Sequence, residues 1–277
     1  MGPAAKRWAS LVRARREEIE RLVPGGGPAG AGFWDRRVEI VAARLRETTA
    51  GDPFLARLRR VSGGGTTVVD VGAGTGRFTV ALAPRVAAIV AVDPSGARLD
   101  LIRADAAELG LTNVDVVEGR WEDVDVAPAD VVFASFVLPV IDDAPAFVAK
   151  LDAVARRHVL LYLGAFTNDA IVDPLWRRFH GRPRRPGPSW LDAVAVLDEM
   201  GIEATVEVVE VRNRTRFATV DEAVDDHLDL LALVDTPDHR DELARLLSQW
   251  LVRGRGGLRL PVATLPAAVL RWTPTSG

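Results

Sequence analysis

Apolar and polar positions along this chain alternate in a regular rhythm of strand-like and helix-like segments. Short apolar runs rich in Val, Ile and Ala are typical of buried strands, whereas apolar residues every three or four positions indicate helices. The runs that predict strands are 68–71, 86–92, 113–118, 129–136 and 158–163. Helices of roughly 10–15 residues between such strands indicate βαβ units, so we predict an α/β fold with a mostly parallel sheet.

The same periodicity predicts the helices. Residues 96–109 have helical spacing and end at Gly110, a residue typical of helix C-termini. Residues 143–155 predict the next helix. Towards the C-terminus we predict a helix over 188–200, a strand over 203–212, two helices within 219–253 and a strand pair around 258–272.

Before the first strand, the spacing of apolar residues and the capping residues predict three helices. Residues 4–23 place Trp8, Leu11, Val12, Ile19 and Leu22 on one helical face. A glycine-rich segment, 24–32, precedes a second helix that opens at Phe33-Trp34-Asp35. A third, short helix begins at Asp52-Pro53, since Asp is a good N-cap and Pro suits the first helical position.

The first strand ends in a turn of unusual composition. Asp70 is followed by Gly72, Gly74 and Gly76, and a helical segment then begins. Glycine permits positive φ and lets a ligand approach the backbone without a Cβ in the way. A dinucleotide fingerprint needs its third glycine one position later, at Arg77, and no Gly-Lys-Ser/Thr follows that would indicate a phosphate-binding P-loop.

A second acidic residue ends the next strand. Asp93 lies 21 residues after Gly72 and is followed by Pro94, which can start a helix. In open parallel sheets, ligands bind beyond the carboxyl ends of the strands, where the strand order reverses. A carboxylate there can accept hydrogen bonds from both hydroxyls of an adenosine ribose. The alternative is that Asp93 only caps the following helix.

Together these features resemble the class I methyltransferases that use S-adenosylmethionine (SAM), over about residues 66–163. The resemblance implies a Rossmann-like, seven-stranded, mostly parallel sheet, SAM as cofactor and S-adenosylhomocysteine (SAH) as product. It places the loop of Asp70, Gly72, Ala73, Gly74 and Gly76 under the methionine part of SAM. The full set of implied cofactor-binding residues is Asp70, Gly72, Ala73, Gly74, Gly76, Asp93, Pro94, Arg120, Trp121, Glu122 and Ser135.

The segment after the third strand departs from the family pattern. The family often has Gly-Asp-Ala at the adenine, and this chain has Gly119-Arg120-Trp121. The acid that would meet the adenine amino group is therefore displaced, to Glu122 or Asp123. Trp121 either stacks on the adenine or packs under the edge of the sheet.

The resemblance also suggests where the methyl acceptor binds. Ser135 and Phe136 end the fourth strand, which borders the transferred methyl group in the family. Residues 1–62 are expected to form an N-terminal helical lid, in which Trp34 either packs between helices or closes over the acceptor. Residues 63–277 would form the SAM-binding domain, with helical insertions at 164–200 and 219–256 that act as a cap or a dimer surface.

The first insertion is basic. Five arginines and His180 fall within residues 177–185, so Arg177 and Arg178 are candidates for binding an anionic acceptor. The alternative is a solvated basic loop. His180 is the candidate general base because histidine titrates near neutral pH. Tyr162, at the end of a strand, either belongs to the core or reaches the acceptor; no residue spacing suggests a metal site.

Bulk composition fits a cytoplasmic enzyme. The net charge is −3, so no general attraction to nucleic acid is expected, and there is no cysteine. No apolar run is long enough to cross a membrane. The two lysines, Lys6 and Lys150, stand against 33 arginines, which is typical of a GC-rich, bacterial genome. We expect a monomer or a homodimer.

These observations predict an enzyme that transfers a methyl group from SAM to an O, N or C atom of a small-molecule acceptor, with an anionic acceptor as one option. Three alternatives share parts of the pattern. They are a nicotinamide-dependent dehydrogenase, an RNA or protein methyltransferase, and a non-catalytic SAM-binding interaction protein.

Overall fold

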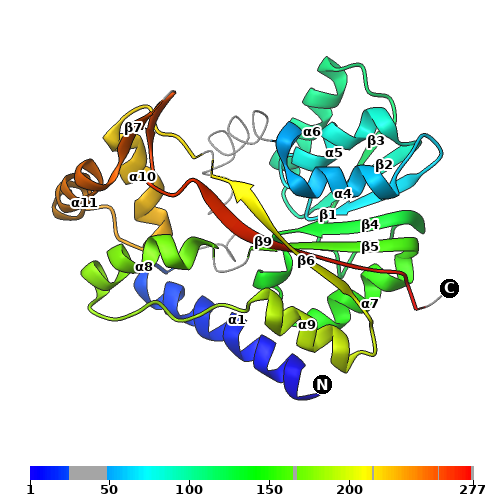
Figure 1. Ribbon diagram of the computed structural model, residues 1–277, viewed down its shortest axis with the longest axis horizontal. Helices are drawn as coiled ribbons and strands as arrows, with labels where there is room; N and C mark the ends of the chain where they lie inside the picture. Colours follow the sequence, from blue (N-terminus) through cyan, green and yellow to red (C-terminus); the bar gives the residue numbers. More distant parts are fainter. Residues whose placement is uncertain (25–48, 165–166, 214, 255, 276–277) are drawn as a thin grey trace.

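The computed structural model describes residues 1–24, 49–164, 167–213, 215–254 and 256–275. A twisted seven-stranded sheet with helices on both faces forms the centre of the molecule, and a second group of helices lies beside it (Figure 1). The predicted second helix, with Phe33 and Trp34, lies outside the described residues, so no position is given for Trp34.

The central sheet has the strand order β3-β2-β1-β4-β5-β9-β6. Strands β1 to β5 pair in parallel, and β9 pairs antiparallel with both β5 and β6. The strands are β1 (Thr67–Val71), β2 (Ala88–Asp93), β3 (Val114–Glu118), β4 (Ala129–Ser135), β5 (Ala155–Gly164), β6 (Thr205–Arg212) and β9 (Thr264–Trp272). The order reverses at β1, which lies between β2 and β4, so a ligand crevice is expected at its carboxyl end.

Helices cover both faces because the inner strands are apolar on both sides. Val68 of β1 packs on one face and Val69 on the other. The first face is covered by α4 (Pro53–Val61) and α5 (Arg77–Leu82), with α6 (Gly96–Glu108) over β2 and β3. The second face is covered by α1 (Pro3–Leu22), α7 (Ala144–Val154) and α9 (Trp190–Glu199). Short 3-10 helices are formed by Thr49–Gly51, Ala83–Arg85 and Leu138–Val140.

Helix α1 is an integral part of the second face. Trp8 is fully buried there, and its Nε1 donates a hydrogen bond to the Ile141 carbonyl at 2.8 Å. Val12 belongs to the same core cluster. This part of the predicted N-terminal lid is therefore fixed against α7 and α9 on the side of the sheet opposite α4.

The C-terminal insertions build a second core. Helices α8 (Thr167–His180), α10 (Val220–Leu230) and α11 (Pro237–Trp250) enclose Trp176, Phe217 and Leu243. The hairpin β7 (Val252–Gly254) and β8 (Gly257–Arg259) forms a separate small sheet. Both strands predicted around 258–272 are present, as β8 and β9, but they do not pair with each other. Gly256 and Gly257 have positive φ and reverse the chain, so β8 pairs with β7 and only β9 enters the central sheet.

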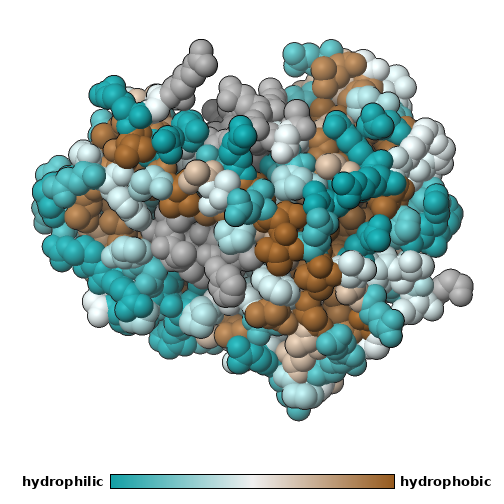
Figure 2. Space-filling view, in the orientation of Figure 1, coloured by the Kyte–Doolittle hydropathy of each residue, from teal (hydrophilic) through white to brown (hydrophobic). Residues whose placement is uncertain are grey.

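Strand β6 is an edge of the central sheet. Apolar residues lie over the middle of the face seen in Figure 2, where β6 and β9 run in Figure 1, and Val208 is 55% exposed. Exposed charged residues alternate with the apolar ones along this strand, including Glu207, Glu210 and Arg212. Such charges on an edge strand disfavour pairing with a further strand.

Candidate active site

The glycine turn at the end of β1 has a backbone conformation that requires glycine and is hydrogen-bonded to β2. Gly72, Gly74 and Gly76 have φ values of 68°, 55° and 79°, all in the region that favours glycine. The N–H groups of Gly72 and Ala73 both donate to the Val92 carbonyl, at 2.8 and 3.0 Å. The turn is therefore tied to β2, and the next helix, α5, begins directly at Arg77.

Gly72 and Gly74 differ in what a side chain would meet. A Cβ on Gly72 would lie 2.2 Å from a methyl group of Val137, whereas a Cβ on Gly74 would meet no atom of the described residues within 4 Å. The space over Gly74 is thus open to a ligand that approaches the bare backbone, while Gly72 is needed to pack the turn against the segment after β4.

A series of alanine substitutions would test this difference. We expect Gly64→Ala, at a position with ordinary φ and open space, to leave stability unchanged. Gly74→Ala should cost about 1 kcal/mol of unfolding free energy, because only the left-handed backbone is strained. Gly72→Ala should cost about 2–3 kcal/mol, because the clash with Val137 is added. Urea denaturation measures all three, and equal effects at Gly72 and Gly74 would contradict the packing role.

Asp93 stands at the carboxyl end of β2 and faces this turn. Its Oδ2 accepts a hydrogen bond from the Gly74 N–H at 2.9 Å, and its Oδ1 accepts one from the Ser95 N–H at 3.0 Å. Arg98 Nη1 lies 3.4 Å from Oδ2. Ser95, not Asp93, caps α6, because its hydroxyl accepts from the Arg98 N–H, and the intervening Pro94 is exposed. Asp93 therefore couples the two strand ends, and an ionised carboxylate has lone pairs left for further donors.

Asp70 lies beneath the turn rather than in the open space above it. Its carboxylate is 2% exposed and accepts a hydrogen bond from the Thr79 hydroxyl at 2.6 Å. Burial raises the pKa of Asp70 from 3.8 to about 7, and the negative charge of Asp93 adds to this effect. Asp70 thus ties β1 to α5 and supports the turn from below.

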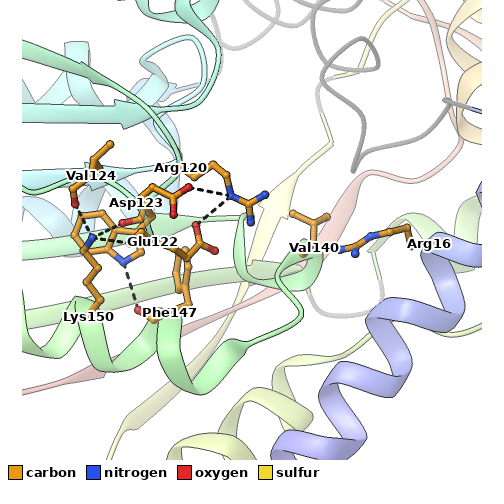
Figure 3. A network of polar contacts seen from close by, with 9 residues as sticks. Arg16, Arg120, Glu122, Asp123, Val124, Val140, Phe147 and Lys150 are labelled. Carbon is orange, nitrogen blue, oxygen red and sulfur yellow. Dashed lines mark hydrogen bonds and ion pairs between the residues drawn. The ribbon is translucent and has the colours of Figure 1, made fainter.

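The loop after β3 continues the same edge of the sheet. Gly119 has a φ of 153° and its N–H donates to the Asp93 carbonyl at 3.1 Å. Arg120 lies on the surface, with its Nε 3.8 Å from Glu122 and 3.7 Å from Asp123 (Figure 3). The Trp121 ring is 4% exposed, packs in the core under α7 and donates from Nε1 to the Phe147 carbonyl at 3.4 Å. Of the two interpretations of Trp121, the structure shows packing under the sheet.

The end of β4 carries a strained residue. Phe136 has a φ of 59°, which is unusual for a residue with a side chain, and its ring is 44% exposed. Its N–H donates to the Tyr162 carbonyl at 2.8 Å, and the two rings lie 4.7 Å apart. Ser135, the preceding residue, is half-buried. Strained residues of this kind cluster at ligand sites, which supports Phe136 as part of the acceptor side.

Tyr162 is a core residue at this edge. It is fully buried and stacks on Phe54 of α4, with ring centroids 4.5 Å apart. Burial raises its pKa far above the ordinary value, so the phenol stays protonated. Nearby, the Arg77 guanidinium forms an ion pair with Asp52, the N-cap of α4. Sequence reasoning did not assign this pair a role at the site, although Arg77 follows the third glycine directly.

The basic residues of the first insertion lie elsewhere. His180 ends α8, a helix of 14 residues and hence about 20 Å long, and its Nε2 is 2.7 Å from the Leu231 carbonyl. Its ring packs on Trp176 at 4.3 Å in the second core. Helix α8 runs from the end of β5 towards α10 (Figure 1). The general-base prediction for His180 therefore has no support from its surroundings.

The arginines of this segment have protein partners. Arg177 pairs with Asp173 at 2.5 Å, and Arg178 pairs with Glu242 of α11. Arg182 pairs with Glu18, a fully buried carboxylate of α1. The last two contacts hold α8 and the following loop against α11 and α1, so each of these arginines already has an acidic partner within the protein.

The described residues contain no group of three His, Asp or Glu side chains placed to hold a metal ion. Within the same residues, every helix is too short or too polar to cross a bilayer.

Part of the chain is similar in sequence to known methyltransferases. Residues 68–158 match a family model described as "Methyltransferase domain". An uncharacterized protein of Haemophilus influenzae is 28% identical over 183 residues, which is 64% of this chain and 66% of that protein. The match thus spans slightly less than two thirds of the relative's length.

Solved structures share the fold. A protein of Bacillus halodurans C-125 is 19% identical, with a TM-score of 0.55 over 79% of this chain and 98% of that one. Magnesium protoporphyrin IX methyltransferase of Synechocystis PCC 6803, solved with bound SAH, is 14% identical, with a TM-score of 0.51 over 97% of this chain and 96% of that one. At such identities these structures establish the common architecture alone.

Proposed function

We propose, from the methyltransferase family model that residues 68–158 match, that the chain transfers the methyl group of SAM to an O, N or C atom of a small-molecule acceptor. The main evidence for the cofactor site is the hydrogen bond between the turn after β1 and Asp93 at the end of β2. Asp93 Oδ2 accepts from the Gly74 N–H at 2.9 Å, and no atom of the described part of the chain lies within 4 Å of where a Gly74 Cβ would be. A Cβ-free backbone next to a carboxylate fits an adenosyl group with its two ribose hydroxyls.

In the proposed site, each group of residues would bind a different part of SAM. Asp93 would accept hydrogen bonds from the ribose, the turn from Gly72 to Gly76 would lie under the methionine part, and residues 119–123 would border the adenine. Ser135 and Phe136, at the end of β4, would face the methyl group. When bound, SAM supplies an electrophilic methyl on its sulfonium.

The protein's main contribution is orientation. Holding the acceptor in line with the methyl group can account for about 7–11 kcal/mol of barrier lowering. A base is required only where the attacking atom is protonated and weakly acidic. Tyr162 is fully buried and stays protonated, and Asp70 is buried beneath the turn, so neither is placed to take that proton. We therefore propose transfer by positioning, without a general base among the described residues.

The charge distribution favours a small acceptor over RNA. The net charge is −3, and three arginines of the 177–185 segment, Arg177, Arg178 and Arg182, form ion pairs within the protein. A nucleic-acid surface needs basic groups that are free to meet phosphates. Porphyrin methylation is the activity named for the Synechocystis relative, and a small-molecule acceptor for this chain is in line with it.

Thermal unfolding with added ligand tests the cofactor assignment. SAM or SAH at about 100 times its dissociation constant should stabilise the protein by about 2.7 kcal/mol and raise the melting temperature by about 5 °C. NADH should have no effect. A shift with NADH and none with SAH would replace the proposal by the dehydrogenase alternative.

Labelled SAM tests the acceptor class. After incubation with tritium-methyl SAM and separated fractions of small molecules, RNA and protein, label is expected only in the small-molecule fraction. Label in RNA or protein would support the corresponding methyltransferase. Binding of SAM without label in any fraction would support a non-catalytic SAM-binding protein.

A further inference from the structure

Lys150, one of only two lysines in the chain, lies on α7 and reaches the loop after β3 (Figure 3). Its Nζ donates to the carbonyl oxygens of Trp121, Glu122 and Val124, at 2.6, 3.3 and 2.5 Å. An ammonium group has three N–H donors and no acceptor, so these three carbonyls use all of its donors. The loop is therefore gathered around one cation.

The Trp121 ring fastens the same loop to α7 a second time. Its centroid lies 5.0 Å from Lys150 Nζ, and its Nε1 donates to the Phe147 carbonyl one turn earlier in the helix. Gly119 opens the loop with a φ of 153°, and a Cβ there would lie 2.3 Å from Val124. Helix α7 thus holds this loop through the Lys150 ammonium group and through the hydrogen bond of the Trp121 indole. Within the loop, Gly119 and Val124 also pack closely against each other.

This arrangement also decides which way the loop's peptide groups point. In a trans peptide the C=O and the following N–H point in opposite directions. Since the Trp121 carbonyl points to Lys150, the N–H of Glu122 points away from α7. Among the described residues, that N–H meets no hydrogen-bond acceptor. The loop is joined to the proposed cofactor site, because Gly119 N–H donates to the Asp93 carbonyl.

We propose that Lys150 is a positioning residue for adenine recognition: it holds loop 119–124 so that the Glu122 amide donates to a ring nitrogen of the adenine. The exocyclic amino group then meets the carboxylate of Glu122 or Asp123, which Arg120 steadies. Lys150 touches no part of the cofactor and acts only through the loop. The inference rests on the proposed cofactor site and adds the device that shapes its adenine end.

Substitution of Lys150 tests this role. K150M keeps the aliphatic stem and removes all three donors, and K6M, at the exposed second lysine on α1, is the matched control. By calorimetry we expect K150M to bind SAH about tenfold more weakly, with K6M within about twofold of wild type. A specific readout is the preference for SAH over S-inosylhomocysteine, which lacks the 6-amino group. That preference should shrink towards unity in K150M and persist in K6M.

The outcomes separate the two claims. Wild-type binding with unchanged K150M affinity and preference overturns the positioning role alone. Absence of SAH binding by the wild-type protein overturns the proposed cofactor site together with this inference. Hydrogen exchange of the wild-type protein gives a result even where K150M does not fold. SAH should slow exchange at the Glu122 amide, and unaltered exchange there overturns the inference.

Discussion

Replacing Asp93 with alanine is expected to weaken SAH binding at least about 100-fold. Two hydrogen bonds from the ribose to an ionised carboxylate would be lost, at roughly 1.5–3 kcal/mol each. The Gly74 and Ser95 amides would also lose their acceptor, so the turn itself would loosen. Titration calorimetry with SAH measures the affinity directly.

Two further variants show whether the loss of SAH affinity is specific to Asp93 and whether it depends on the charge of this residue. Asp100→Ala removes an acid on α6 whose side chain is 73% exposed and pairs with Arg103, so it should leave the affinity unchanged. Asp93→Asn keeps the shape of the side chain and removes its charge, so an intermediate loss is expected. Full SAH affinity in Asp93→Ala would refute the assignment of the ribose to this residue.

Asp70→Asn is expected to make the protein more stable than wild type, by an amount that grows with pH. The pKa of Asp70 is about 7 in the folded protein against 3.8 when unfolded, because burial disfavours the charge. Between these values the folded state holds a proton that the unfolded state has released, so wild-type stability falls as the pH rises through this window. Asparagine carries no such proton and can still accept the Thr79 hydroxyl.

The slope of this effect is at most about 1.4 kcal/mol per pH unit, and it levels off above about pH 7. Urea denaturation from about pH 5 to about pH 8 measures it. Asp130→Asn is the control, since the Thr67 amide lowers the pKa of Asp130 and its contribution is constant over that range. A constant difference between Asp70→Asn and wild type across this range would show that Asp70 is charged throughout.

The positions of Asp93 and Asp70 in their strands could be predicted from the sequence, but the surroundings of their side chains could be predicted only in part. Asp93 was placed at a strand end by the length of the apolar run, and the structure confirms β2 ending at this residue. Asp70 was grouped with the cofactor-binding loop, yet its carboxylate faces Thr79 under the turn. The difference arises because the sequence gives the position of a residue in a strand but not which neighbour its side chain meets.

The sequence by itself determined the parallel sheet and the glycine turn. These features depend on local properties: alternation of apolar runs, the φ preference of glycine and the capping of helix ends. The resemblance to the methyltransferase family, rather than a local pattern, implied a sixth parallel strand at Val206–Arg212 and an antiparallel seventh at Val269–Trp272, and β6 and β9 occupy those places.

Only the tertiary structure decided where the long side chains go. His180 was the candidate base and the arginines near it were candidate acceptor ligands. The structure packs His180 against the second core, with its ring nitrogen at the Leu231 carbonyl. Arg177 and Arg178 lie exposed on α8 and pair with acidic side chains. Lys150 had no local signal, because its three carbonyl partners lie 26–29 residues away along the chain. Contacts across such separations are fixed by how helices pack on the sheet, which no short-range pattern records.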